Sequence, residues 1–120
     1  MIQAGVLQQP TSLLLTTTSV TDVLALAAGR PDVVTVAGWK IINADSSDRL
    51  VSLWWTDNST DYLIFRGVVG ANSTMWDDAA DLKLMAKSTA KKIRAQAAAA
   101  NVVTVTLITT SSPQQTQNAG

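Results

Sequence analysis

Few residues of this chain could carry chemistry. The chain has 120 residues with neither Cys nor His, and all nine of its acidic residues are Asp. A nucleophile and its base would therefore have to be Ser or Thr with Lys, or paired Asp. The densest carboxylate group is Asp77, Asp78 and Asp81, which could flank a glycosidic bond or hold a metal. We interpret it as a solvated turn or a helix N-terminus, where Asp is favoured, and expect no enzyme, cofactor or metal site.

A second acidic segment, 57–61, has the sequence Asp-Asn-Ser-Thr-Asp. It places oxygen ligands at alternate positions, as some calcium loops do, but it lacks the glycine and the distal glutamate of an EF-hand. Asp, Asn and Ser also hydrogen-bond their own backbone in turns. We therefore predict an ordinary hairpin connection here.

Four tryptophans are the next candidates, because an exposed Trp can stack on a sugar ring or anchor a protein interface. Alternation places Trp55 on the same face as the apolar residues of its strand, and Trp39 lies in a long apolar run, so both are expected in the core. Trp54 is expected to point toward solvent or a partner, and Trp76 to lie in a loop. The alternative is that loop 68–76 folds over Trp54.

The charge pattern excludes several partners. Nine Lys and Arg balance the nine Asp, so the net charge is +0, whereas a nucleic-acid binder normally carries a basic surplus. The cluster Lys91, Lys92 and Arg94 is interpreted as a solvated strand edge. No run approaches the roughly 18 apolar residues of a membrane span, and the N-terminus lacks the basic start of a signal peptide. We expect a soluble protein made in its final form, without nucleic-acid or membrane partners.

The elements that must position these residues are predicted to be strands. Thr and Val are abundant and Glu is absent, which favours pleated structure over helix. Apolar and polar residues alternate clearly over 51–56, 82–87, 92–97 and 103–107. The fold class is therefore all-β, a single antiparallel β-sandwich of about eight strands, jelly-roll-like or immunoglobulin-like. The ranges are 11–17, 21–27, 33–43, 50–56, 61–66, 82–87, 92–97 and 102–109. The Ala-rich stretch 79–100 leaves a helix as the alternative, and a short helical turn is expected near 77–81.

The segment 61–66 is apolar on both faces. Alternation places Tyr62 and Ile64 on one face, and Leu63 and Phe65 on the other. A single sandwich buries only one face of a sheet, so the second face is expected to be covered by a loop or by another chain. The alternative is that the segment is itself a loop.

The termini are expected to be arms flanking the sandwich. We divide the chain into an N-terminal arm, 1–10, a β-sandwich domain, 11–110, and a polar C-terminal arm, 111–120. An extended arm that lies along a neighbouring subunit is our hypothesis, and a tail folded on its own domain or held by crystal packing is the alternative. The candidate assembly or partner contacts are Ile2, Val6, Leu7, Trp54, Tyr62, Ile64, Trp76, Gln114 and Gln115.

The order of these segments resembles small virion proteins of tailed bacteriophages. The resemblance covers about residues 11–109 and contains no catalytic motif. It begins with the Thr-rich run 12–18 and continues with Ile-Ile-Asn-Ala at 41–44. The aromatic strand 51–57 and the pair of strands 92–97 and 101–107 complete it. Ser88-Thr89-Ala90-Lys91 stands where the family has a Pro-Gly or Gly-Asp turn, which keeps the helical alternative open.

The resemblance implies a non-enzymatic β-sandwich of the virion. The expected role is a capsid decoration or cement protein that binds across neighbouring major capsid subunits, with a trimer as the expected homo-oligomer. The expected location is the capsid surface of the virion, after synthesis in the host cytoplasm. A tail, neck or fibre component is the alternative within the virion. A carbohydrate-binding module for host attachment, based on Trp54 and Trp76, is the alternative outside it.

Overall fold

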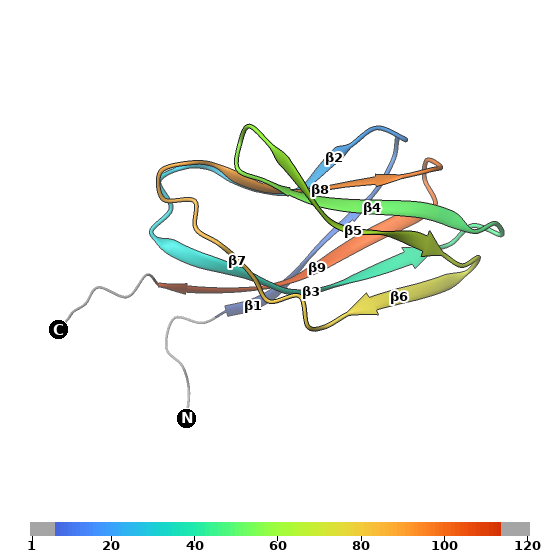
Figure 1. The fold of residues 1–120 in the computed structure, drawn as a ribbon. Helices are drawn as coiled ribbons and strands as arrows, with labels where there is room; N and C mark the ends of the chain where they lie inside the picture. The colour runs from blue at the N-terminus through green and yellow to red at the C-terminus, as the bar shows by residue number, and fades with distance from the viewer. Residues whose placement is uncertain (1–6, 114–120) are drawn as a thin grey trace, which may run out of the picture.

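The computed structural model describes residues 7–113 as two antiparallel β-sheets packed face to face (Figure 1). One sheet has five strands in the order β1-β9-β3-β6, with β7 also pairing with β3; the other has the order β2-β8-β4-β5. The all-β sandwich prediction is confirmed. The strands are β1 (Leu7–Leu14), β2 (Thr21–Leu26), β3 (Asp32–Asn43), β4 (Arg49–Thr56), β5 (Asp61–Val69), β6 (Ser73–Asp77), β7 (Leu82–Leu84), β8 (Lys91–Ala97) and β9 (Val103–Pro113).

The core lies between the sheets and is built from alternate residues of the long strands. In β9, Val103, Val105 and Leu107 are fully buried, while the Thr residues between them face outward. Such alternation is what a sheet with one solvated face requires. The strand pairing begins at Leu7 and ends at Pro113, so the described sandwich extends beyond the expected limits of 11 and 110.

The Ala-rich stretch forms strands, as the alternation predicted. In β8, Ile93, Ala95 and Ala97 are buried, whereas Lys92 and Arg94 point outward. Alanine favours helix, but the apolar residues of this stretch recur with a period of two. This period gathers them on one face only if the stretch is a strand. The basic cluster is therefore not at an edge, because β8 lies between β2 and β4.

The prediction of a helical turn near 77–81 is wrong. Asp77 is the last residue of β6, and the segment that follows is irregular up to β7. The side chain of Asp77 accepts a hydrogen bond from the backbone N–H of Ala79 at 2.9 Å, and Asp81 has a left-handed φ of 45°. Both features belong to turns rather than to a helix. Within residues 7–113 no helix is long and apolar enough to cross a membrane.

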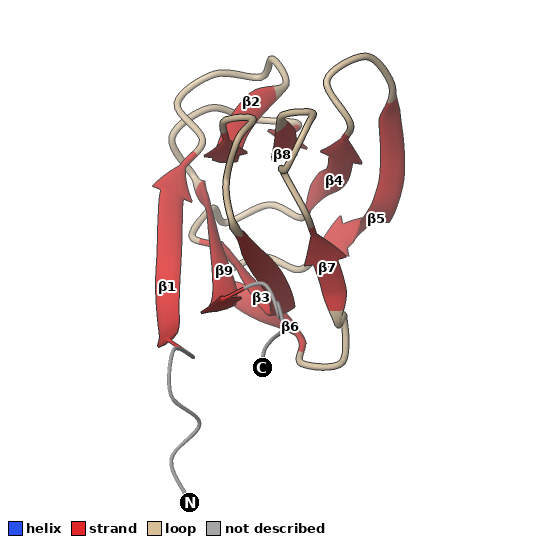
Figure 2. Cartoon of the chain, turned by 90° about the vertical axis from the view of Figure 1, so that its left-hand side faces the viewer, coloured by secondary structure: helices blue, strands red, loops and turns tan. Residues whose placement is uncertain are grey.

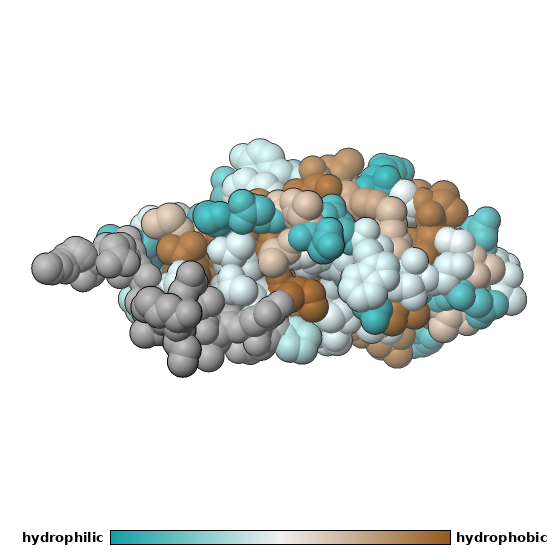
Figure 3. Space-filling view, turned by 90° about the horizontal axis from the view of Figure 1, so that it is seen from below, coloured by the Kyte–Doolittle hydropathy of each residue, from teal (hydrophilic) through white to brown (hydrophobic). Residues whose placement is uncertain are grey.

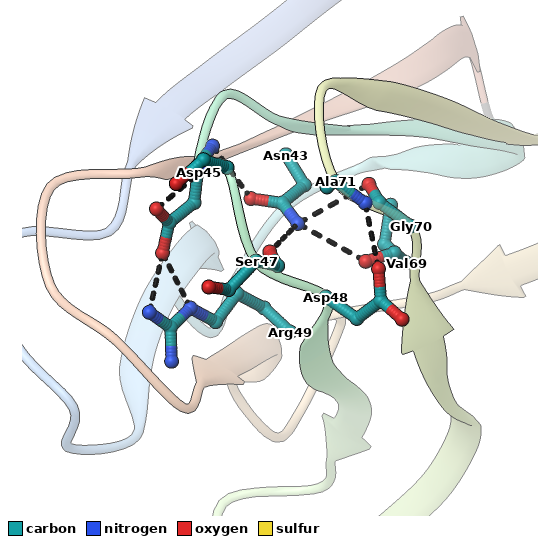
Figure 4. Close-up of polar contacts among 9 residues, drawn as sticks. Asn43, Asp45, Ser47, Asp48, Arg49, Val69, Gly70 and Ala71 are labelled. Carbon is teal, nitrogen blue, oxygen red and sulfur yellow. Dashed lines mark hydrogen bonds and ion pairs between the residues drawn. The ribbon is translucent and has the colours of Figure 1, made fainter.

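One buried polar residue joins the two sheets at one end of the sandwich. Asn43, at the end of β3, is fully buried, and its side-chain nitrogen lies 2.9 Å from Ser47 O, 3.0 Å from Val69 O and 3.2 Å from Gly70 O (Figure 4). Its side-chain oxygen accepts the N–H of Asp45 at 2.9 Å. A buried amide is stable only when its polar atoms are satisfied, and this one is.

Candidate functional site

The outer face of the four-stranded sheet carries a groove beside Trp54. Its volume is about 320 Å³, and polar and apolar residues of β4, β5, β8 and the loop before β2 line it. Four of the lining residues are Ser52, Trp54, Arg66 and Gln96. Trp54 is half-buried and lies on the outer face, as predicted, while Trp39 is buried and Trp55 packs against the core.

Strand register positions the groove residues. Ser52 of β4 pairs with Gln96 of β8 on one side and with Arg66 of β5 on the other. Trp54 lies two residues along β4 and therefore on the same face. Gln96 is held in place because its Nε2 donates to the carbonyl oxygen of Thr18 at 3.0 Å. The result is an aromatic ring set in a row of hydrogen-bonding side chains.

Arg66 is a cation without an ion pair among the described residues. It lies in β5, where its neighbours in sequence are Phe65 and Gly67, and it is exposed. In contrast, Arg94 on the same face contacts Asp22 at 2.9 Å and Asp61 at 3.3 Å. Arg66 therefore has a free guanidinium at the groove, which suits an acceptor on a ligand or partner.

A second hollow, of about 290 Å³, continues along the same face. Its lining is Thr56, Asn58, Ser59, Asp61, Lys92 and Arg94. The charges here are already paired within the sheet, since Lys92 contacts Asp22 at 3.2 Å and Arg94 bridges two Asp residues. This end of the face is polar and internally neutralised.

The turn beside this hollow is the predicted hairpin between β4 and β5. The Asp57 side chain accepts the N–H of Ser59 at 3.2 Å and that of Thr60 at 3.0 Å, and Asn58 has a left-handed φ of 84°. The bonds from Thr60 and Ser59 lower the pKa of the Asp57 carboxyl. The carboxylate therefore stabilises the turn, and the hairpin interpretation is confirmed.

The edge strand β5 gathers exposed apolar side chains. Tyr62 is 42% exposed, Leu63 52% and Val68 62%. Tyr62 nevertheless packs its ring on Trp55, with ring centroids 4.6 Å apart and planes inclined by 22°. Apolar area of this kind, left on the surface of a single chain, is typical of an interaction surface.

The predicted alternation in 61–66 is partly wrong. The pairing of β4 with β5 shifts between Leu53 and Trp54, so that Ile64 has no opposite residue. Because of this bulge, Ile64 and Phe65 both pack against the core instead of facing opposite ways. Leu63 is left on the outer face opposite Trp54. The segment is a strand, not a loop.

Trp76 lies on the other sheet. It was expected in a loop, but it belongs to β6, where it pairs with Lys40 of β3. Its side chain is 65% exposed, and the Lys40 ammonium lies 4.7 Å from the ring centroid. Trp54 and Trp76 therefore occupy opposite sheets and do not form one site. The segment 68–76, considered as a loop over Trp54, is instead partly strand.

Figure 3, seen from the five-stranded side, shows apolar groups interspersed with neutral and polar ones.

The three carboxylates Asp77, Asp78 and Asp81 do not form one site. Asp77 closes a turn, and Asp81 pairs with Lys83 at 2.8 Å. Among residues 7–113, no three His, Cys, Asp or Glu side chains are placed to hold a metal ion. Asp77 and Asp81 therefore make their contacts at the connection between β6 and β7.

The other candidates lie at the chain ends. Ile2, Val6, Gln114 and Gln115 lie outside the described residues. Leu7 pairs through its backbone with Ser111 of β9.

Sequence reasoning missed Arg66 and Gln96 as site residues. A single charge within the apolar run Tyr-Leu-Ile-Phe-Arg-Gly-Val-Val was the available signal for Arg66. Gln96 had a weaker signal, its outward position opposite the buried Ala95 and Ala97.

Comparison with solved structures gives a distant structural similarity. No family model and no curated protein sequence matches this chain. Among solved structures, it is similar to part of the Clostridium thermocellum N-terminal endo-1,4-beta-D-xylanase 10B CBM22-1–GH10 modules, in complex with xylohexaose. The TM-score is 0.38 and the identity 12%, over 97% of this chain and 27% of that one. The chain thus spans about a quarter of that protein's length.

Proposed function

We propose that this chain is a non-enzymatic structural protein of a phage virion that decorates or cements the capsid surface. The observation that carries the proposal is the exposed apolar surface at β5 and its neighbour β4. Its members are Leu50, Leu63 and Val68 on the outer face, which are 38%, 52% and 62% exposed. A rigid sandwich that presents such a surface suits adhesion to other subunits. The order of its segments, which resembles virion proteins, supports the same role.

The mechanism of adhesion rests on shape and apolar contact. The net charge is zero, and several surface charges are paired within the sandwich, as in the Asp22, Lys92 and Arg94 group. Long-range attraction to a highly charged partner is therefore weak. Contacts would come from apolar side chains and backbone groups, and many copies on one shell would raise the total affinity by avidity.

The partner is a major capsid protein or another virion subunit, together with further copies of this chain. The terminal segments 1–6 and 114–120 would extend this contact across neighbouring subunits. Within the virion, a tail, neck or fibre position is distinguished by copy number. A decoration protein occurs in a multiple set by capsid symmetry, whereas a tail component occurs in a few copies or one ring.

Two sets of variants test the proposal with particles that lack the chain. The double variant Leu63→Lys/Val68→Lys replaces the exposed apolar surface and is expected to lose particle binding. Met85→Lys is the matched control, since Met85 is 49% exposed but lies after β7. The second set deletes only 1–6 and 114–120, because Leu7–Pro10 pair with β9 and their removal would damage β1. If both sets saturate particles like the wild type, the adhesion mechanism is wrong.

A second candidate function is glycan binding for host attachment, favoured by the groove beside Trp54. The half-buried ring has Gln96, Ser52 and the unpaired Arg66 around it. An aromatic face with adjacent donors and acceptors is the arrangement that a sugar ring requires, because its C–H face stacks and its hydroxyls hydrogen-bond.

Glycan arrays and purified host surface polysaccharide test this second candidate. Trp54→Ala is expected to abolish binding. Trp76→Ala, which removes the more exposed Trp of the opposite sheet, should leave binding unchanged. Equal loss in both variants, or no binding by the wild type, contradicts a sugar site at Trp54.

A further inference from the structure

The sandwich has one long edge strand without proline. Edges carry unpaired backbone N–H and C=O groups and are normally shielded by proline, charge, bulges or short length. β1 contains Pro10, β6 has five residues, and β2 combines a register shift with the charged Asp22. β5 also has a register shift, at Ile64, and two charges, Asp61 and Arg66. It is nevertheless nine residues long, has no proline and lies at the end of its sheet (Figure 2).

From Asp61 to Val68 the outward backbone of β5 is free within the described part of the chain, whereas the carbonyl oxygen of Val69 accepts a bond from Asn43. β5 pairs with β4 alone, and no backbone hydrogen bond outside the strand ladders involves residues 61–69. The side chains beside this edge are apolar and exposed, above all Leu63 and Val68. A partner that fits such an edge is another extended strand, joined by main-chain hydrogen bonds.

The charges of β5 are complementary to those of a second, antiparallel β5. In a two-fold pairing, each residue lies opposite its mirror position in the same strand. An axis between Leu63 and Ile64, at the register shift of β5, places Asp61 opposite Arg66 of the second copy, and Tyr62 opposite Phe65 of the second copy. Because of the shift, the two members of each pair lie on the same face. This register brings Arg66 to the carboxylate of Asp61 in the second copy, which lies 3.3 Å from Arg94 within its own chain and would be shared by the two cations. It repeats the ion pair on both sides of the axis.

We infer that β5 pairs with β5 of a second copy, antiparallel, and joins two four-stranded sheets into one continuous sheet. The inference rests on the proposed assembly function and gives self-association a defined site. A two-fold contact produces dimers, in place of the trimer that the resemblance implies. The contact covers a single strand of each copy, so it is smaller than a standard stable interface and gains strength from multiple copies.

Charge reversal tests the pairing and its register. Asp61→Arg gives the strand two cations, and Arg66→Asp gives it two anions, so each variant is expected to dimerise at least about tenfold more weakly than the wild type. Mixing the two variants restores complementarity on both sides of the axis and should give a mixed dimer. The double variant Asp61→Arg/Arg66→Asp should dimerise with itself. Lys87→Asp, an exposed reversal in the loop before β8, is the control and should dimerise like the wild type.

Native mass spectrometry and sedimentation over about 10 µM to 1 mM protein give the readout. Circular dichroism confirms folding of each variant, and the double variant replaces any single variant that does not fold. A wild type that stays monomeric, a trimer, single variants that dimerise normally, or a mixture that fails to pair each overturn the inference. A monomer that still co-purifies with virions refutes the pairing alone. A dimer absent from virions refutes the proposed function alone.

Discussion

The side-chain nitrogen of Asn43 lies 3.0 Å from the carbonyl oxygen of Val69, and this contact joins β3 to β5 across the two sheets. The same amide holds the turn after β3 through Ser47 O and the turn after β5 through Gly70 O. One buried side chain therefore closes this end of the sandwich and fixes where β5 ends.

Asn43→Ala is expected to destabilise the fold strongly. It removes the donor to the carbonyls of Ser47, Val69 and Gly70, of which the contact with Val69 is buried. The expected cost is about 2–4 kcal/mol of the free energy of unfolding. Chemical denaturation measures the change. Ser46→Ala is the control, because its exposed side chain carries no bond in the turn, and it should remain within about 0.5 kcal/mol of the wild type. Equal stability of Asn43→Ala and Ser46→Ala contradicts the closing role of Asn43.

Gly38→Ala is expected to separate β3 from the segment after β6. A Cβ at Gly38 would lie 2.2 Å from the Asp77 carbonyl oxygen and 2.9 Å from the Asp78 Cα, so backbone must move. The expected loss is about 1–3 kcal/mol, with faster amide exchange in β6. Gly70→Ala is the control, since its nearest atom is Ser73 Oγ at 3.4 Å. Unchanged exchange in β6 of the Gly38 variant contradicts this close packing.

Ala95→Leu tests whether the Ala-rich stretch packs as a strand. Ala95 is fully buried between the sheets, so three added carbons overpack the core and cost about 1–3 kcal/mol. Ala25→Leu, at an exposed position of β2, should change stability little. Thermal unfolding compares the two variants. A tolerated Ala95→Leu would mean that this face of β8 does not lie in the core.

The hydrogen bonds to the Asp32 carboxylate are expected to stabilise the fold at neutral pH but not in acid. Its hydrogen bonds from Arg30, at 2.7 and 2.9 Å, and from Ser111 hold the pKa of its carboxyl well below the ordinary range. A lowered pKa in the fold contributes stability above the unfolded-state value of about 3.9, and that stability disappears as pH falls through the folded-state value. The stability difference between wild type and Asp32→Asn should therefore shrink from about pH 5 to about pH 2.

The control for this pH dependence is Asp78→Asn, since Asp78 is exposed and has no bond or ion pair among the described residues. Its stability difference from the wild type should stay constant over the same range. A difference for Asp32→Asn that does not change with pH contradicts the ion pair with Arg30 as a source of stability.

The fold class was predictable because the apolar pattern has a period of two wherever a strand has one buried face. Ile93, Ala95 and Ala97 show this most clearly, since their period prevailed over the helix propensity of alanine. The pattern failed where the chain departs from regular pairing. The bulge at Ile64 turns two successive side chains inward, and nothing in the local sequence marks its position.

The candidate site was predictable only in part, because a site depends on which strands become neighbours. Trp54 could be placed on the outer face from alternation within its own strand. Its neighbours Arg66 and Gln96 come from β5 and β8, and the pairing order of these strands is not encoded locally. For the same reason the sequence could not reveal that Trp54 and Trp76 lie on different sheets.

Quantitative mass spectrometry of purified particles tests the virion role most directly. Particles from a culture that produces this chain are separated from free protein on a density gradient, and its copy number is measured relative to the major capsid protein. We predict that the chain co-sediments with particles at a copy number set by capsid symmetry. Its recovery only in the free-protein fraction, with particles devoid of it, would contradict the proposed virion function.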